Sequence, residues 1–228
     1  MLFRSRPVQQ AAARWLLDQA DREHGGFGPA PKFPHAADLA WLMERATAEG
    51  DEAAGEHVQR TLARMAEGGL FDPLAGGFFR YSVDERWEIP HFEKMLADNG
   101  PLLALYAEAA AWTGSPLFGR TVEGVAGWLM QEMALAPAGF AASLDADMEG
   151  GEGAHYLWTP EQVRAALTPL EWDVASAHWN LMDGANFEGR LWHLRAVRST
   201  AELAATFRQP QAALDAVIDG ARSEEHTS

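Results

Sequence analysis

The sequence predicts an all-α fold with a small β-hairpin, in which helical hairpins form part of an α/α toroid. Three observations support this expectation. Long stretches carry apolar residues at the spacing of an amphipathic helix, short loops rich in glycine and aromatic residues separate them, and the apolar period changes after about residue 133. Because long helices joined by loops that gather at one end pack as hairpins, a toroid of helix pairs is expected.

Four of the expected helices follow directly from the apolar spacing. The first places Ala12, Trp15 and Leu16 on one side, and GGFGPAPKFP after it holds too many glycines and prolines to continue a helix. The same spacing predicts that Trp15, Trp41 and Trp128 lie in the core. These four helices are expected at 8–20, 36–48, 53–66 and 116–133.

A fifth helix is expected to begin in RYSVDERWEIPHFEKMLADNG, at Pro90, because proline suits the first helical position. Asn99 lands near the centre of its apolar stripe, and Gly100-Pro101 should kink or restart the helix. The stripe consists of Phe92, Met95, Leu96, Leu102, Leu103 and Tyr106.

The pattern changes in the last third of the chain. AGFAASLDAD and AHYLWT flank the acidic loop MEGGEG and predict a β-hairpin. Thr159-Pro160-Glu161-Gln162 and Thr168-Pro169-Leu170-Glu171 both have the form of a capping box, so each should start a short helix. The segment at 186–197 is expected to be extended.

The composition excludes several classes of function. With 228 residues, 47% hydrophobic and 22% charged, the chain is an ordinary globular one without the long apolar run of a membrane span. No cysteine is present, so it is no thiol oxidoreductase as it stands, and a cytoplasmic location fits. The net charge of −15 is spread along the chain and disfavours nucleic-acid binding.

The last seven residues, RSEEHTS at 222–228, are identical to the translation of a sequencing adapter, AGATCGGAAGAGCACACGTCT. We therefore expect the natural sequence to extend to residue 221 and then to continue differently. On this interpretation the chain is a fragment of a longer protein.

Four loop motifs occur in order: GGFGPAPKFP, GGLFDPLAGGFFRYSVDERWEIPHFEKMLADNG, GFAASLDADMEGGEGAHYLWTPEQV and NFEGRL. With them, residues 25–194 resemble the helical region of the thioredoxin-domain-containing proteins related to the spermatogenesis-associated thioredoxin-like protein. The resemblance implies a six-hairpin (α/α)6 toroid, of the kind used by N-acylglucosamine 2-epimerases and several glycoside hydrolases. It also implies that residues 1–221 are the N-terminal half of the toroid, and that a thioredoxin-like domain and the C-terminal half are missing here.

His91, Glu93 and Asp98 are the first candidates for catalysis. A histidine can act as general acid or base near neutral pH, and Glu93 can orient it or act alone. On a helix, however, Glu93 lies about 200° around the axis from His91, whereas Asp98 lies two turns on and nearly aligned, so Asp98 is the better partner. The alternative is that His91 and Glu93 only cap the start of a helix.

Asp145 and Asp147 are further catalytic candidates, because alternation places both on one face of a strand. The alternative is a solvated acidic hairpin, and this is the expectation for Glu149 and Glu152. DADMEG opens like a calcium loop, but Tyr156 stands where that loop needs a bidentate glutamate. We expect no metal site and no cofactor.

Asn99 in an apolar stripe must find hydrogen-bond partners, either in a buried polar network at the toroid centre or as the cap of a helix that restarts at Pro101. Other polar and aromatic residues on the loops suit a sugar, because guanidinium groups bind hydroxyls and indoles cover the apolar ring face. Together the candidate binding residues are Lys32, Phe33, Asp72, Arg80, Tyr81, Trp87, Lys94 and Asn99.

Two functions stay open. The first is a carbohydrate-active protein, similar to a sugar epimerase, isomerase or glycoside hydrolase, with a sugar or other small molecule as ligand. The second is a non-catalytic α/α scaffold that carries a thioredoxin-like domain and binds a protein partner or a small ligand. The toroid by itself does not decide between them, because fold does not fix function.

Overall fold

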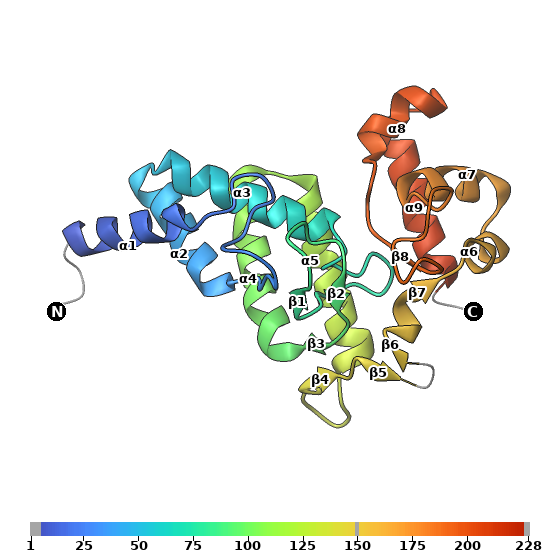
Figure 1. The fold of residues 1–228 in the computed structure, drawn as a ribbon, viewed down its shortest axis with the longest axis horizontal. Helices are drawn as coiled ribbons and strands as arrows, with labels where there is room; N and C mark the ends of the chain where they lie inside the picture. Colours follow the sequence, from blue (N-terminus) through green and yellow to red (C-terminus); the bar gives the residue numbers. More distant parts are fainter. Residues whose placement is uncertain (1–5, 149–150, 226–228) are drawn as a thin grey trace.

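The computed structural model describes residues 6–148 and 151–225. They form two lobes, each with its own hydrophobic core (Figure 1). The N-terminal lobe contains helices α1 to α5 and strands β1 to β6, and the C-terminal lobe contains helices α6 to α9. None of the helices in these ranges is long and apolar enough to cross a membrane.

The helices of the N-terminal lobe pack as antiparallel neighbours, and they confirm the expected helical segments. Helix α2 packs on α3, α4 packs on α5, and α2 also contacts α4. Asp51 caps α3 by accepting a hydrogen bond from the amide of Ala54. The helices are α1 (Arg6–Asp18), α2 (Ala36–Glu49), α3 (Glu52–Glu67), α4 (Leu96–Thr113) and α5 (Pro116–Trp128), followed by a π-helical turn at Leu129–Met133.

Helix α4 differs from the expectation in two ways. It begins at Leu96 and not at Pro90, because the preceding residues are extended and pair with other strands. It also runs through Pro101 without a restart. Proline there removes a single amide donor near the helix start, and the buried side chains of Asn99 and Leu102 hold this turn in the core.

The strands are short and form antiparallel pairs. The expected hairpin exists only at its tip, where β5 pairs with β6, while its outer parts pair with distant segments. The pairs are β1 (Tyr81–Ser82) with β2 (Pro90–His91), β3 (Lys94–Met95) with β4 (Ser143–Leu144), β5 (Asp147–Met148) with β6 (Gly151–Glu152), and β7 (Leu157–Trp158) with β8 (Trp192–His193). The extended segment expected at 186–197 therefore contains β8.

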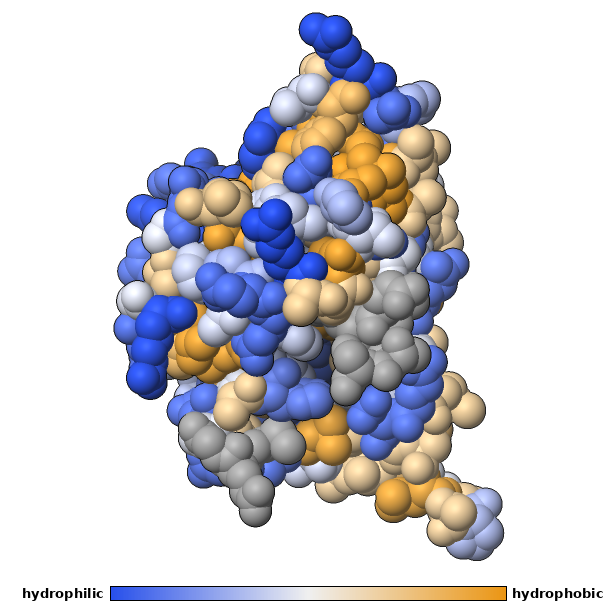
Figure 2. All heavy atoms as spheres, turned by 90° about the vertical axis from the view of Figure 1, so that its right-hand side faces the viewer, coloured by the Kyte–Doolittle hydropathy of each residue, from blue (hydrophilic) through white to orange (hydrophobic). Residues whose placement is uncertain are grey.

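The C-terminal lobe consists of α6 (Pro160–Ala166), α7 (Pro169–His178), α8 (Thr200–Phe207) and α9 (Gln211–Glu225). Both expected capping boxes are present, at Thr159 with Gln162 and at Thr168 with Glu171. The face that this lobe presents mixes hydrophobic and strongly hydrophilic residues (Figure 2).

The tryptophans expected in the core divide between the interior and the surface. Trp128 is buried, Trp41 is partly buried, and Trp15 is 64% exposed. The expectation for Trp15 was therefore wrong. Helix α1 lies at the edge of the lobe, and it contacts the rest of the lobe through the side that carries the buried Ala13.

The two lobes meet at β8 and the segment after it, through polar contacts and through the rings of Phe79 and Phe92, which pack against that of His193. The His193 ring contacts the Gly69 carbonyl with Nε2 at 2.6 Å, and the Ala196 amide donates to the Glu67 carbonyl at 3.0 Å. Arg195 forms an ion pair with Glu88 at 3.2 Å.

Candidate acid–base site at the loop face

The motif loops that precede α2 and α4 lie against each other. The backbone of Lys32 exchanges two hydrogen bonds with that of Ser82, at 2.8 and 2.9 Å. Beside this bridge the ring of Phe33 packs on that of Tyr81, with ring centres 4.8 Å apart. The glycine- and aromatic-rich loops thus form one surface at the start of two neighbouring helices.

The residues of PHFEK alternate across this surface because residues 90–95 form strands β2 and β3, with a bend between them, and not a helix. His91 and Glu93 face one side, where both are partly exposed, while Phe92 and Lys94 point into the core and are fully buried. The expected 200° separation of His91 from Glu93 was therefore wrong, since a period of two places them on the same side.

His91 lies between two carboxylates. Its Nδ1 is 2.7 Å from Oε1 of Glu152, and its Nε2 is 3.9 Å from Oε2 of Glu93. The ring stacks on Tyr81, with centres 5.1 Å apart and planes inclined by 20°. When the ring is neutral and Nδ1–H donates to Glu152, Nε2 carries the free lone pair of a general base.

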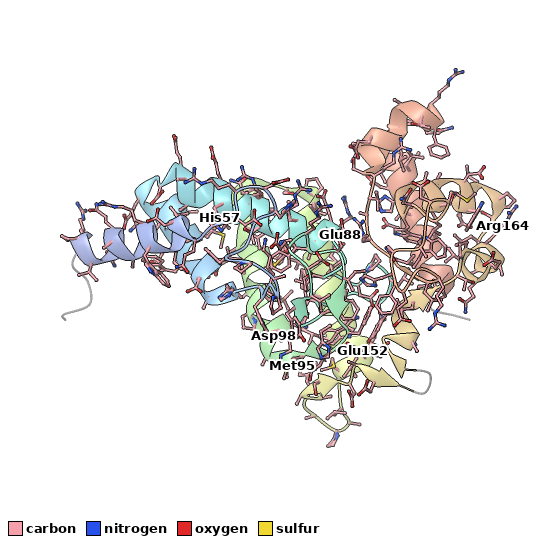
Figure 3. All side chains as sticks on the ribbon, in the orientation of Figure 1. His57, Glu88, Met95, Asp98, Glu152 and Arg164 are labelled. Atoms are coloured by element: carbon pink, nitrogen blue, oxygen red, sulfur yellow. The ribbon has the colours of Figure 1, made fainter. Side chains whose placement is uncertain are left out.

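Asp98 does not pair with His91 along a helix, because no helix includes His91. Asp98 lies in the first turn of α4, while Glu152, which contacts His91, lies on β6 (Figure 3). Burial raises the pKa of Asp98, Arg80 opposes this change, and the negative charge of Glu93 adds to it. Arg80 itself forms an ion pair with Glu93 at 2.9 Å. Oδ2 of Asp98 is enclosed and has no hydrogen-bond partner among the described residues.

Lys94 and Asp72 form a buried pair behind this surface. The ammonium is 2.7 Å from Oδ2 of Asp72 and donates to the Gly76 carbonyl at 2.7 Å. Burial opposes ionisation of Asp72, but Lys94, together with the Leu74 amide and His193, outweighs it and lowers the pKa of this carboxyl. Burial lowers the pKa of Lys94, and Asp72 only partly offsets that effect. Both residues stand at the wall of a cavity of about 710 Å³.

Three other expected binding residues lie inside the core. Lys32 pairs with Asp21 and donates to the Gly25 and Glu85 carbonyls. The Trp87 indole donates to the His24 carbonyl at 3.0 Å. Asn99 accepts a hydrogen bond from the Phe78 amide at 2.7 Å and donates one to the Phe78 carbonyl at 2.8 Å, so its buried side chain links α4 to the loop at Phe78. Because α4 runs through Pro101, Asn99 does not cap a restarted helix.

Asp145 and Asp147 are exposed, and the Asp147 amide donates to Oδ1 of Asp145 at 3.1 Å. Their catalytic role stays a prediction, and Glu149 lies outside the described residues. Within the ranges that the structure describes, no group of three or more His, Asp or Glu side chains is placed to hold a metal ion.

Three contacts were not expected from the sequence. Glu152, which was expected at a solvated tip, contacts His91. Tyr156 and His193 pack in the core beside Phe92. Burial raises the pKa of Tyr156, and it lowers the pKa of His193, for which hydrogen bonding to the Gly69 carbonyl acts in the opposite direction. Tyr156 stacks on Phe92, with ring centres 5.8 Å apart. No local pattern could have found these contacts, because the partners are far apart in sequence.

Comparison with known proteins agrees with the motif resemblance. No protein-family model matches the chain. Spermatogenesis-associated protein 20 of Homo sapiens is 36% identical in an alignment of length 191 that covers 75% of this chain and 24% of that protein. An uncharacterised protein of Caenorhabditis elegans is 36% identical in an alignment of length 186 that covers 73% of this chain and 25% of that protein. The chain thus spans about a quarter of the curated relatives that it matches.

A solved structure shows the same fold. Cellobiose 2-epimerase from Bacillus thermoamylovorans superposes with a TM-score of 0.51 over 66% of this chain and 42% of the epimerase, at 10% identity. This likeness shows the α/α toroid fold and nothing about activity. Together with the sequence matches it identifies the chain as a relative of spermatogenesis-associated protein 20 that contains part of an α/α toroid.

Proposed function

We propose that residues 1–221 are the N-terminal half of an (α/α)6 toroid in a carbohydrate-active protein, and that His91 is its general acid or base. The contact between His91 Nδ1 and Glu152 carries this proposal. A histidine whose Nδ1 is held by a carboxylate, and whose partly exposed Nε2 lies beyond hydrogen-bond distance of Glu93 at 3.9 Å, suits proton transfer. The proton would come from the carbon next to a sugar carbonyl, as in an epimerase, or go to a leaving group.

The neighbours of His91 fit a sugar ring. Phe33 is 41% exposed and stacks beside Tyr81, so the two rings offer an apolar shelf next to the imidazole. Arg80 and Glu93 add a donor and an acceptor for hydroxyls at the edge of the shelf. The fold shared with cellobiose 2-epimerase supports this class of ligand by analogy alone.

The test uses the longer parent protein, because the site requires the whole toroid. Mono- and disaccharides, including N-acetylated ones, would be screened by thermal shift on the parent and on His91→Ala. The matched control is His155→Ala, because His155 is also exposed but contacts Tyr156 and not the His91 cluster. We expect one sugar class to stabilise the parent and the control, and not His91→Ala.

The same experiment addresses the second function. If no sugar stabilises the parent, the carbohydrate proposal is wrong, and a scaffold attached to a thioredoxin-like domain becomes the better explanation. Pull-down with the parent would then identify its protein partner. The cytoplasmic location expected from the cysteine-free sequence is part of the proposal in either case, and fractionation of cells that express the parent tests it.

A further inference from the structure

Arg80 and Glu93 are neighbours on two segments that pair with each other. The Arg80 amide donates a hydrogen bond to the Glu93 carbonyl at 2.8 Å, and Nη1 of Arg80 lies 2.9 Å from Oε2 of Glu93. The backbone bond places the two side chains next to each other, as in other opposite-charge pairs between extended segments. Glu93 therefore has a cation beside it in the folded chain.

The oxygen that Arg80 holds also faces the imidazole of His91. Oε2 of Glu93 is 3.9 Å from Nε2, which is beyond hydrogen-bond distance, while Nδ1 is 2.7 Å from Oε1 of Glu152. A movement of about 1 Å would bring Oε2 to a proton on Nε2. Arg80 and a protonated His91 thus compete for one carboxylate oxygen.

Other titratable side chains face this imidazole and its neighbours from three elements. Tyr81 of β1 stacks on the ring, Glu152 of β6 contacts Nδ1, and Asp98 lies in the first turn of α4. Burial raises the pKa of Asp98, Arg80 opposes this change, and Glu93 adds to it. Arg80 thus supplies positive charge to a group that contains three carboxyl side chains.

This arrangement decides how readily the imidazole acts as a base. A general base needs a free lone pair in its neutral form. A carboxylate that bonds to the protonated ring stabilises the charged form, so the ring would hold its proton instead of exchanging it. Glu93 would have that effect in contact with Nε2, and it has less of it while Arg80 holds its oxygen and offsets its charge.

We propose that Arg80 is a positioning residue for His91, which holds Oε2 of Glu93 and so keeps that carboxylate from bonding to Nε2. The inference rests on the proposed role of His91 as general acid or base, and it adds what sets the reactivity of the ring. Without Arg80, the Glu93 carboxylate turns to the protonated imidazole and stabilises it. A larger share of the rings then carries a proton on both nitrogens near neutral pH and lacks the lone pair.

NMR titration of the His91 imidazole in the 228-residue chain tests this, because the side chains involved all lie in the N-terminal lobe. Arg80→Gln should raise the pH midpoint of this titration by about 0.5 unit, a modest shift because the new contact is partly exposed. In the Glu93→Gln background the same change should raise the midpoint by less than about 0.2 unit, since no carboxylate is left to turn to Nε2.

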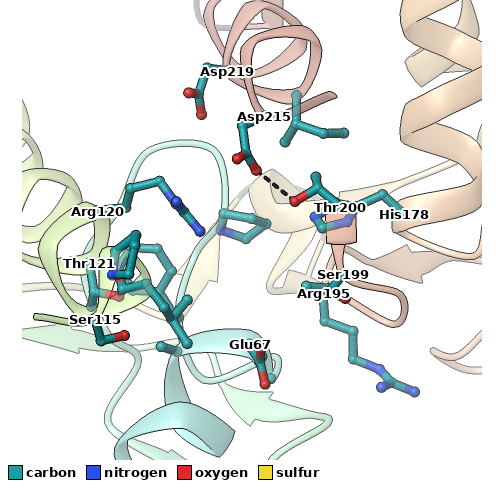
Figure 4. Close-up of a pocket in the computed structure, with 18 of the residues that line it drawn as sticks. Glu67, Ser115, Arg120, Thr121, His178, Arg195, Ser199, Thr200, Asp215 and Asp219 are labelled. Carbon is teal, nitrogen blue, oxygen red and sulfur yellow. Dashed lines mark hydrogen bonds between the residues drawn. The ribbon is translucent and has the colours of Figure 1, made fainter. Parts of the chain in front are cut away.

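Two further variants serve as controls. Arg120→Gln removes the same charge from α5, where Arg120 extends into a pocket between the lobes that neither His91 nor Glu93 lines (Figure 4). This change should leave the midpoint as it is. Arg80→Lys keeps a cation beside Glu93 and should keep most of the wild-type value. The Arg80 side chain is 44% exposed, so its replacement leaves the core intact, and the amide spectrum of each variant checks this.

An unchanged midpoint in Arg80→Gln overturns the proposal. An equal rise with and without the Glu93 carboxylate also overturns it, because Arg80 would then act on the imidazole directly. The titration needs no sugar, so its result is independent of the sugar screen. A rise that depends on Glu93, combined with a failed screen, would show that the coupling exists and that the proposed function is wrong.

Discussion

The Lys94 ammonium lies 2.7 Å from Asp72 Oδ2, and both side chains are enclosed in the core of the N-terminal lobe. The Leu74 and Ala75 amides donate to Oδ1 of Asp72, at 2.9 and 3.2 Å, so the carboxylate is held from both sides. The ammonium also lies 4.9 Å from the ring centre of Phe79. This pair fastens the loop before the first strands to the segment that carries His91.

Replacing one member of this pair should therefore destabilise the fold strongly. Lys94→Met keeps most of the side-chain volume but leaves the Asp72 carboxylate buried without its counter-ion. We expect a loss of roughly 3–5 kcal/mol in the free energy of unfolding, measured by urea denaturation. The double variant Asp72→Asn with Lys94→Met should recover part of that loss, because no unpaired charge then remains in the core. A loss below about 1 kcal/mol in Lys94→Met would show that the pair has little structural role.

Asn99 should contribute through hydrogen bonds alone. Asn99→Leu keeps the number and branching of the side-chain heavy atoms, but it leaves the Phe78 amide and carbonyl without their side-chain partners inside the core. We expect a loss of about 3 kcal/mol, since each unsatisfied buried group costs about 1–3 kcal/mol. Urea denaturation again measures this, and an unchanged midpoint would mean that water replaces the side chain.

Gly153 should control the position of Glu152. Its φ is +72°, and a Cβ there would lie 2.4 Å from the Phe92 ring. Gly153→Ala should therefore displace the segment after β6 and weaken the contact between Glu152 and His91. A change in the His91 imidazole NMR signals of the variant checks this. It should be absent from Gly119→Ala on α5, where φ is not positive and an added Cβ meets no atom within 4 Å. Unchanged signals would contradict it.

The helices were predictable because their signals are local. Thr159 and Thr168 each lie three residues before the side chain that completes the capping box, so the sequence alone indicates where α6 and α7 begin. The start of α4 was not predictable in the same way. Pro90 suits both a first helical position and a strand with a free edge, and only pairing with Tyr81–Ser82 decides for the strand.

The candidate site was predictable in part. The motif loops identified His91, Glu93, Arg80, Tyr81 and Phe33, which the structure brings together in one surface. The Glu152 contact spans 61 residues, so it depends on how the hairpin packs and leaves no local signal. Lys94 and Asp72 pair with each other in the core and also line the cavity of about 710 Å³, so their expected binding role stays a prediction.

His57 should make the fold sensitive to acid. Burial, and then the charge of Arg60, lower the pKa of His57 to about 4 from 6.5. The unfolded chain takes up this proton as the pH falls through 6.5, whereas the folded chain resists it down to about 4, so stability is lost across that interval. His57→Phe, which keeps a ring against Phe27, should reduce the loss between pH 7 and pH 4.5 by about 2 kcal/mol. Urea denaturation at pH 7 and pH 4.5 measures it, and an equal loss in both proteins would contradict this assignment.

Glu67 should have the opposite dependence on pH. Its raised pKa means that the folded state favours the protonated carboxyl. The free energy of unfolding therefore falls as the pH rises from the ordinary pKa to the folded-state pKa, and it is lowest above that value. Glu67→Gln mimics the protonated form, and it should raise the free energy of unfolding near pH 7.5 by a few tenths to about 1 kcal/mol. The gain should disappear below pH 4.5, the ordinary pKa of a glutamate side chain, because the carboxyl is then protonated in both states.

Denaturation curves at several pH values check this, with exposed Glu56→Gln on the same helix as the control. A gain that does not change with pH would show that the benefit comes from packing and not from removal of a charge.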